Sequence, residues 1–109
     1  MDSDVTAPQV AELWTAGTIQ LIDVRQDHEF AAGRIAGARH LELTQLAAQA
    51  GTVKRDRPVV FYCRSGTRSA VATDAFAQAG FDAHNMVGGL LAWQAAGLPL
   101  DPDDGYVAD

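Results

Sequence analysis

The sequence predicts a single domain of the α/β class, with a central, mostly parallel sheet of about five strands and helices on both of its faces. Short apolar runs alternate with amphipathic stretches along the whole chain. The runs scarcely alternate between polar and apolar positions, which is typical of strands buried on both faces. The connections are short, so we expect successive strands to be joined by right-handed helical crossovers.

The first half of the chain is predicted to begin with a helix from Thr6 to Gly17. Thr6 and Gln9 form a capping-box pattern, and Gly17 is a typical helix end. The residues that follow predict, in order, a buried strand at 19–24, a short helix at 27–32, a brief strand at 39–41 and a helical stripe from 43 to 50.

The second half contains the most strand-like segment, residues 59–62, which ends directly before Cys63. Apolar spacing then predicts a helix at 69–79 stopped by Gly80, a last strand at 83–87 and a helix at 90–96. Ligands of parallel α/β sheets bind outside the carboxyl ends of the strands. Asp23, Arg25 and Cys63 all lie at such ends, so we expect the functional site there.

The charge balance argues against two classes of partner. Eight basic residues stand against 14 acidic ones, giving a formal net charge of −6. Nucleic acids and anionic membranes are bound by clustered Lys and Arg, which this chain lacks, so neither is expected as a partner. No apolar stretch is long enough to cross a bilayer, and acids occupy the amino terminus, where a secretory signal would carry bases. We therefore expect a soluble, cytoplasmic protein.

The domain is expected to span residues 1–100. Residues 101–109 hold four acids and no base. Such a segment is typical of a solvated chain end, so we expect an acidic, mobile tail. The three histidines, His28, His40 and His84, lie in separate segments without ligand spacing, and we expect neither a metal ion nor another cofactor.

Cys63 is the single cysteine of the chain, and it is either a buried inert thiol or a reactive one. It opens the segment Cys63-Arg64-Ser65-Gly66-Thr67-Arg68-Ser69, between a buried strand and an amphipathic helix. Such a loop can point its backbone N–H groups at the sulfur, and Gly66 permits the turn. The helix dipole and the guanidiniums of Arg64 and Arg68 favour the thiolate. We therefore interpret Cys63 as a nucleophile.

The length of the loop indicates which anion it holds. Phosphoryl transfer through a cysteine uses the spacing Cys-x5-Arg, whereas Cys63 and Arg68 give Cys-x4-Arg. The smaller ring suits a single sulfur carried on the cysteine as a persulfide, with the negative outer sulfur accepting the N–H hydrogen bonds.

In these features the chain resembles the rhodanese-like sulfurtransferases, specifically the short single-domain members. The resemblance covers nearly the whole chain and includes the loop. The other matching segments are the opening helix from Thr6 to Gly17, Leu21-Ile22-Asp23-Val24-Arg25 with Glu29-Phe30 and Gly33-Arg34-Ile35-Ala36-Gly37-Ala38, and Val87-Gly88-Gly89 with Trp93 and Gly97-Leu98-Pro99. The family commonly has proline where Ala36 stands.

The resemblance implies a sulfur transfer in two steps. The Cys63 thiolate takes a sulfane sulfur from thiosulfate or a related anionic donor, and the persulfide passes it to cyanide or to a thiol, including a thiol on an acceptor protein. Arg64 and Arg68 would bind the donor, and the backbone N–H groups of Ser65, Gly66 and Thr67 would hold the persulfide. Asp23 would pair with a loop arginine and keep the loop in shape.

Other interpretations stay open at this point. A persulfide carrier that relays sulfur between partner proteins would use the same residues, and an arsenate- or phosphate-directed relative is disfavoured by the loop length. Arg25 is interpreted as half of a structural ion pair, and Trp14 and Trp93 as core residues. Gly88-Gly89 is interpreted as a point of close backbone packing beside the loop.

Overall fold

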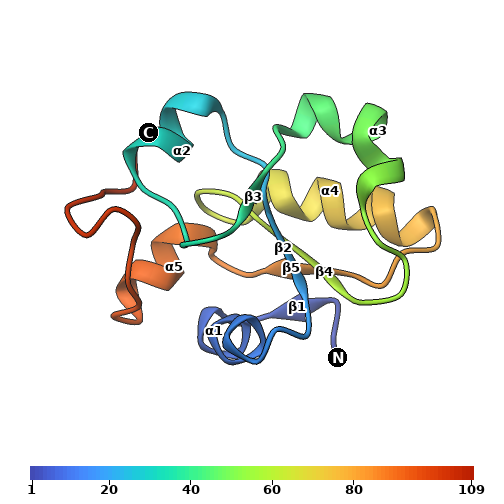
Figure 1. Ribbon diagram of the computed structural model, residues 1–109, viewed down its shortest axis with the longest axis horizontal. Coiled ribbons are helices and arrows are strands. Elements are labelled where there is room, and N and C mark those ends of the chain that lie inside the picture. Colours follow the sequence, from blue (N-terminus) through green and yellow to red (C-terminus); the bar gives the residue numbers. More distant parts are fainter.

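The computed structural model describes residues 1–109 (Figure 1). Its elements in chain order are β1 (Asp4–Val5), α1 (Ala7–Ala16), β2 (Gln20–Asp23), α2 (Asp27–Ala32), β3 (Arg39–His40), α3 (Leu46–Gln49), β4 (Val59–Tyr62), α4 (Thr67–Gln78), β5 (Ala83–Met86) and α5 (Gly89–Ala95). Two short 3₁₀ turns, Leu43–Gln45 and Ala50–Thr52, flank α3.

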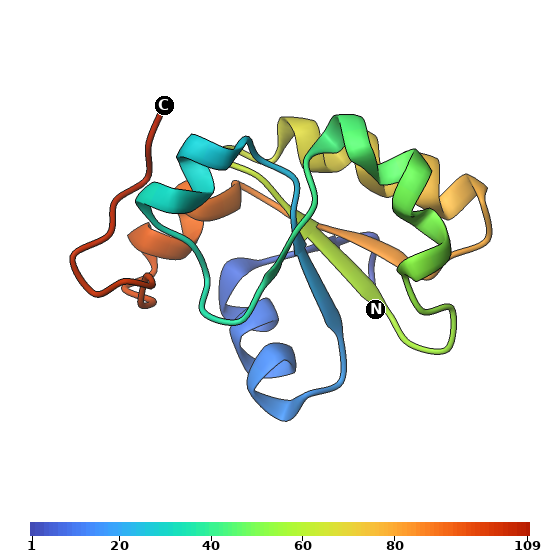
Figure 2. The same ribbon diagram turned by 45° about the horizontal axis from the view of Figure 1, so that its top comes forward.

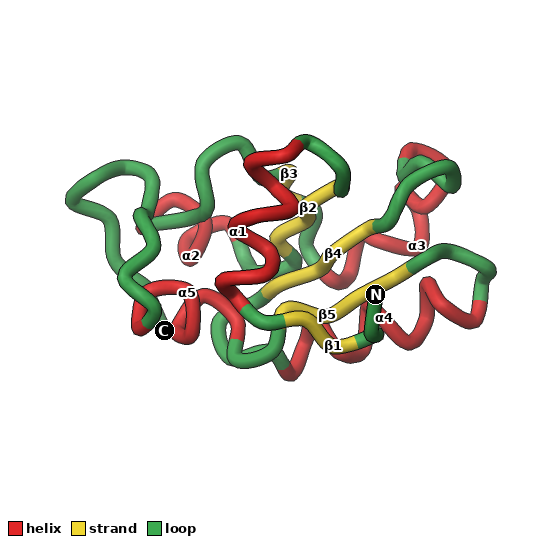
Figure 3. Tube along the Cα trace, turned by 90° about the horizontal axis from the view of Figure 1, so that it is seen from below, coloured by secondary structure: helices red, strands yellow, loops and turns green.

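The five strands form one sheet in the order β1-β5-β4-β2-β3, and every neighbouring pair is parallel (Figure 3). This confirms the predicted α/β class and the parallel sheet. The central strand β4 lies between β2 and β5, and its last residue, Tyr62, is in register with Asp23 at the end of β2. The carboxyl ends of β2 and β4 therefore lie side by side, where the chain continues into Arg25 and Cys63.

Helices cover both faces of the sheet, with α3 and α4 on one side and α1 and α5 on the other (Figure 2). Alternate residues of β4 point to opposite faces, because successive side chains of a strand do so. Val59 and Phe61 belong to one buried cluster with residues of α3 and α4, which includes Leu46, Phe76 and Cys63. Val60 and Tyr62 belong to the other cluster, which contains Val10, Leu90 and Trp93.

Most predicted elements agree with the structure, and three differ for local reasons. The first helix begins after Thr6 with the expected capping box and ends at Gly17 in the left-handed region. The strand β1 was not predicted, since it has only two residues and pairs with the distant β5. The predicted stripe at 43–50 has only four α-helical residues. The helix α4 begins at Thr67, two residues earlier than predicted, because Gly66 is its N-cap.

Residues 101–109 lie along the domain and are joined to it by backbone hydrogen bonds at Asp101 and Tyr106, and the mobility expected of this segment stays a prediction. Asp101 exchanges two backbone hydrogen bonds with Arg34, and the backbone N–H of Tyr106 donates to the carbonyl of Ala32. A Cβ on Gly33 would lie 2.5 Å from the Tyr106 carbonyl oxygen, so the two backbones are in direct contact. The absence of side-chain bulk at Gly33 thus lets this segment reach α2, which composition alone did not indicate.

Candidate active site

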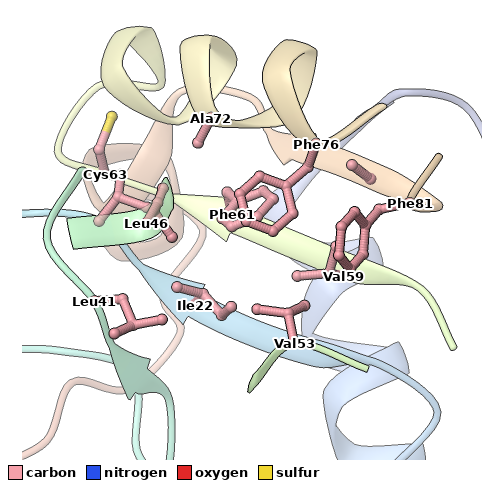
Figure 4. Packing of buried hydrophobic residues seen from close by; sticks show 12 residues of the cluster. Ile22, Leu41, Leu46, Val53, Val59, Phe61, Cys63, Ala72, Phe76 and Phe81 are labelled. Atoms are coloured by element: carbon pink, nitrogen blue, oxygen red, sulfur yellow. The ribbon is translucent and has the colours of Figure 1, made fainter. Parts of the chain in front are cut away.

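Cys63 follows β4 directly and is only 1% exposed. Figure 4 shows its sulfur at one end of the apolar cluster, pointing away from Phe61 and Phe76 toward the start of α4. The carboxyl end of a central parallel strand thus presents the thiol to the first turn of the next helix. This is the location that the sequence predicted.

Three hydrogen-bond donors surround the sulfur. The backbone N–H of Gly66 lies 3.1 Å from Cys63 Sγ, the backbone N–H of Ser69 lies 3.5 Å away, and the Ser69 hydroxyl oxygen lies 3.4 Å away. Burial would raise the pKa of the Cys63 thiol, but hydrogen bonds from the Ser69 hydroxyl and from the backbone N–H groups of Ser69, Gly66 and Ser65 outweigh it. The pKa of Cys63 is therefore lower than its ordinary value, and the arrangement favours a thiolate.

The loop keeps its shape through contacts with the start of α5. The backbone N–H of Leu90 donates to the carbonyl of Cys63 at 2.8 Å, and that of Leu91 donates to the carbonyl of Arg64 at 3.1 Å. A Cβ on Gly89 would lie 2.4 Å from the Cys63 carbonyl oxygen, and one on Gly66 would lie 3.0 Å from the Gly88 nitrogen. The interpretation of Gly88-Gly89 as close backbone packing beside the loop is thus confirmed.

Arg68 is held by a carboxylate of α2. Its guanidinium donates two hydrogen bonds to Glu29, at 2.7 and 2.9 Å, and Glu29 is almost fully buried. The hydrogen bond from Arg68 is the main reason that the pKa of Glu29 is lowered, although burial acts in the opposite direction. Sequence reasoning predicted a donor-binding role for Arg68 and did not assign Glu29 to the site.

Acid should therefore destabilise the protein in part through Glu29. The folded chain binds the Glu29 proton less readily than the unfolded chain, so the unfolded chain takes up more protons as the pH falls below about 4.5. The stabilisation is complete above that pH and is lost as the pH falls through the lowered pKa. We expect the acid-side decrease in the free energy of unfolding, measured by urea titration between pH 5 and about pH 3, to be shallower in Glu29→Gln. Glu12→Gln, which alters an exposed carboxylate without an ion pair, should keep the wild-type slope.

Arg64 points toward the tail segment. Its Nη2 lies 2.7 Å from a carboxylate oxygen of Asp109, whose side chain is 94% exposed. Its Nε is buried and has no hydrogen-bond partner. A buried guanidinium N–H without an acceptor is uncommon, and it leaves one hydrogen-bonding position of Arg64 unfilled.

Asp23 and Arg25 form a buried ion pair. Arg25 Nε and Nη2 donate to the Asp23 carboxylate at 2.9 and 2.7 Å, and both side chains are fully buried. Burial lowers the pKa of Arg25, but the hydrogen bonds and charge of Asp23 outweigh this and raise it. The structural ion pair predicted for Arg25 is confirmed. Asp23 was predicted to pair with a loop arginine. Its partner in the structure is Arg25, two residues further along the chain, whose guanidinium contacts both carboxylate oxygens.

Two buried polar residues of the site were missed from the sequence. Ser69 and Asn85 are 0% and 7% exposed, and the Ser69 hydroxyl donates to Asn85 Oδ1 at 2.6 Å. The side-chain N–H of Asn85 donates to the carbonyl of Gly66 at 3.2 Å. Asn85 lies within the last predicted strand, where buried residues were expected. A polar side chain at such a position was the signal that could have identified it.

The remaining loop residues and the cavities add less to the site. The hydroxyl oxygens of Ser65 and Thr67 are exposed and lie 3.4 Å apart. A cavity of about 150 Å³ is lined by Arg68 and by residues that follow β2 and β3. The largest cavity, about 400 Å³, lies between α1 and α5 and is lined by Trp14 and Trp93, with no residue of the loop. Its indole N–H groups are bonded to backbone carbonyls.

One group of side chains could hold a metal ion. The ligand atoms of Asp27, His40 and Glu42 all lie within 4.8 Å of one another. Protein partners already contact them: His40 Nε2 lies 2.7 Å from the Arg25 carbonyl oxygen, and Glu42 accepts from the backbone N–H of Asp27. The sequence did not indicate this group, because Asp27 lies in a different segment from His40 and Glu42.

The domain is of the α/β class, and its single cysteine lies between the central parallel strand β4 and the first turn of α4. Residues 6–96 match the family described as the rhodanese-like domain. The chain belongs to this rhodanese-like sulfurtransferase family, as its sequence motifs predicted.

Relatives differ in length. A sulfurtransferase of Allochromatium vinosum is 33% identical over 106 residues, which cover 96% of each chain. The thiosulfate sulfurtransferase GlpE of Pseudomonas aeruginosa (strain LESB58) is 32% identical over 100 residues, covering 91% of this chain and 90% of GlpE. The HTH-type transcriptional regulator Rv0324 of Mycobacterium tuberculosis is 35% identical over 100 residues, but the match spans only 44% of its length.

Solved structures agree with the fold. A rhodanese-related protein from Thermoplasma volcanium superposes with a TM-score of 0.84 at 25% sequence identity, covering 91% of this chain and 97% of that one. None of the helices has both the length and the apolar character that a membrane span requires.

Proposed function

We propose that the chain is a thiosulfate sulfurtransferase that carries sulfur as a Cys63 persulfide. The observation that carries the proposal is the buried sulfur at the end of β4, surrounded by the N–H groups of Gly66 and Ser69 and by the Ser69 hydroxyl. These donors stabilise negative charge on sulfur, which the nucleophile needs before it attacks. The names of the relatives support the same chemistry.

The two steps conserve atoms and charge. The Cys63 thiolate attacks the outer sulfur of thiosulfate, a new S–S bond forms, and the old S–S bond breaks with its electron pair leaving on sulfite. The persulfide now carries its negative charge on the outer sulfur. Cyanide or a thiolate attacks that sulfur, the bond to Cys63 breaks, and the Cys63 thiolate is regenerated.

The site residues take different roles in this proposal. Arg64 binds the anionic donor through its unpaired Nε, and the N–H groups of Ser65, Gly66 and Thr67 hold the outer sulfur of the persulfide. Arg68 contributes its charge from a position fixed by Glu29. Asp23 pairs with Arg25 and so stabilises the chain at the end of β2, beside the loop.

The two loop arginines should therefore respond differently to substitution. Arg64→Ala should lower kcat/KM for thiosulfate about 10-fold, the loss of one charge-assisted hydrogen bond, with little change in Tm. Arg68→Ala leaves the buried Glu29 carboxylate unpaired and should lower the free energy of unfolding by about 1–2 kcal/mol, after allowance for the solvent exposure of Arg68. Initial rates and thermal unfolding of both variants check this. Equal effects of the two substitutions on Tm would contradict the different roles.

Steady-state turnover distinguishes an enzyme from a carrier. The proposal predicts continuous thiocyanate formation from thiosulfate and cyanide by catalytic amounts of protein. A persulfide carrier would load sulfur but release it only to its partner protein, so the chain would gain one sulfur atom and thiocyanate would not rise above the uncatalysed background. The cytoplasmic location stays a prediction.

A further inference from the structure

Asn85 contacts both residues whose N–H or O–H groups hydrogen-bond to the Cys63 sulfur. Its Oδ1 accepts from the Ser69 hydroxyl at 2.6 Å, and its Nδ2 donates to the carbonyl of Gly66 at 3.2 Å. Gly66 and Ser69 in turn lie next to Cys63 Sγ. Asn85 lies on β5, the strand beside β4, so a rigid element of the sheet supports both ends of the loop turn.

The Ser69 hydroxyl has one hydrogen and two acceptors within reach. Asn85 Oδ1 can only accept a hydrogen bond, and so can a thiolate. The hydroxyl oxygen lies 2.6 Å from Asn85 Oδ1 and 3.4 Å from Cys63 Sγ. Rotation of the hydroxyl moves its hydrogen from one acceptor to the other. The amide oxygen of Asn85 and a thiolate at Cys63 therefore compete for the same hydrogen.

The proposed reaction changes which acceptor is stronger. In the free enzyme the negative charge is on Cys63 Sγ, and a charged acceptor forms the stronger bond with the Ser69 hydroxyl. In the persulfide, Sγ is the uncharged inner sulfur and the charge is on the outer sulfur. The Ser69 hydrogen then forms its better bond with Asn85.

We propose that Asn85 is a positioning residue that accepts the Ser69 hydrogen when sulfur is loaded, and so stabilises the persulfide relative to the free thiolate. The inference rests on the proposed function, since the persulfide is one of the two states. Asn85 does not touch the reacting sulfur and acts through Ser69. This role of Asn85 leaves the two covalent steps of the proposed sulfur transfer unchanged.

Removing the Asn85 acceptor should have two measurable effects. In Asn85→Ala the Ser69 hydrogen always points to Sγ, so the pH profile of Cys63 alkylation by iodoacetamide should shift to lower pH. The ratio of loaded to free Cys63, measured by intact mass at a fixed ratio of thiosulfate to sulfite, should fall about 3–10-fold, the factor that one hydrogen bond contributes. A loss of loop structure alone would shift the profile to higher pH, because the N–H groups would no longer reach the sulfur.

The charged groups near Cys63 are unchanged by these substitutions. They are Arg64 and Arg68 of the loop, Asp23 and Arg25 after β2, and Glu29 of α2. The strand β5 also carries His84, which bonds to Asp82 and to the backbone of Asp2. A shift in Asn85→Ala therefore reports on hydrogen bonding.

A double-mutant cycle with Ser69→Ala assigns the effect to the shared hydrogen. Once the hydroxyl is absent, Asn85→Ala should no longer shift the alkylation profile to lower pH, and it should no longer reduce the ratio of loaded to free Cys63. Thr73→Ala removes another buried hydroxyl, one that bonds to the Ser69 carbonyl, and should leave the profile at the wild-type position. The same low-pH shift with and without Ser69 would overturn the inference.

Asn85→Asp provides a second test if the alanine variant does not fold. A carboxylate adds negative charge beside the thiolate and is a stronger acceptor for the Ser69 hydrogen, so the alkylation profile should shift to higher pH, and by more when Ser69 is present than in Ser69→Ala. An upward shift of the same size with and without Ser69 would contradict the inference, because charge alone would then explain it. If the wild-type protein takes up no sulfur, the proposed function fails, while the alkylation profiles still test the competition for the Ser69 hydrogen.

Discussion

Replacing Cys63 with serine is expected to abolish sulfur loading and thiosulfate turnover while the fold stays intact. Cys63 is the single thiol, and a hydroxyl of similar size is far less acidic and less nucleophilic, so thiocyanate formation should fall at least about 10³-fold, to the uncatalysed background. The loss reflects chemistry more than packing, because the side chain stays small. Initial rates and circular dichroism of the purified variant check both parts. Turnover near the wild-type rate in Cys63→Ser would exclude a covalent mechanism.

Replacing Gly89 with alanine is expected to disrupt the loop from outside it. The new Cβ would lie 2.4 Å from the Cys63 carbonyl oxygen and 2.6 Å from the Arg64 carbonyl carbon, both backbone atoms that cannot move without moving the loop. Displacing the N–H groups around the sulfur by even about 1 Å should reduce turnover about 100-fold. The free energy of unfolding should fall by about 3 kcal/mol, from the clash and the left-handed backbone together.

Gly97→Ala is a matched control for backbone strain. Gly97 has a φ of +76°, in the same left-handed region as Gly89 at +59°, but nothing lies within 4 Å of its Cβ position. We expect this variant to lose only about 1 kcal/mol of stability and to keep wild-type turnover. If Gly97→Ala and Gly89→Ala reduced turnover equally, the contact between α5 and the loop would have no special importance.

Local patterns explain why much of the fold could be predicted. The Thr6 capping box and Gly17 mark both ends of α1 within a short stretch of sequence, and the buried run of β4 ends directly at Cys63. The strand β1 has no such signal, because its stability comes from pairing with β5, about 80 residues further along the chain. The position of Cys63 depended on β4 and α4, both of which have strong patterns.

The partners of the arginines could not be predicted, because they come from distant segments. Arg68 pairs with Glu29, 39 residues earlier in the chain, and Arg64 pairs with Asp109. Charge counting predicted that both guanidiniums would favour the thiolate at Cys63. In the structure the hydrogen bonds from Ser69, Gly66 and Ser65 lower the pKa of the thiol. The loop was predicted to point backbone N–H groups at the sulfur, and those of Gly66 and Ser69 do so. The Ser69 hydroxyl was not predicted as a donor, because its direction depends on the geometry of the loop.

The intact mass of the protein after thiosulfate treatment tests the central claim most directly. The wild-type chain, desalted after incubation with thiosulfate, should gain the mass of one sulfur atom, and a reducing thiol or cyanide should remove it. Cys63→Ser treated in the same way should gain nothing, since it lacks the nucleophile. A wild-type protein that gains no mass, or a gain of the same size in Cys63→Ser, would contradict a persulfide at Cys63.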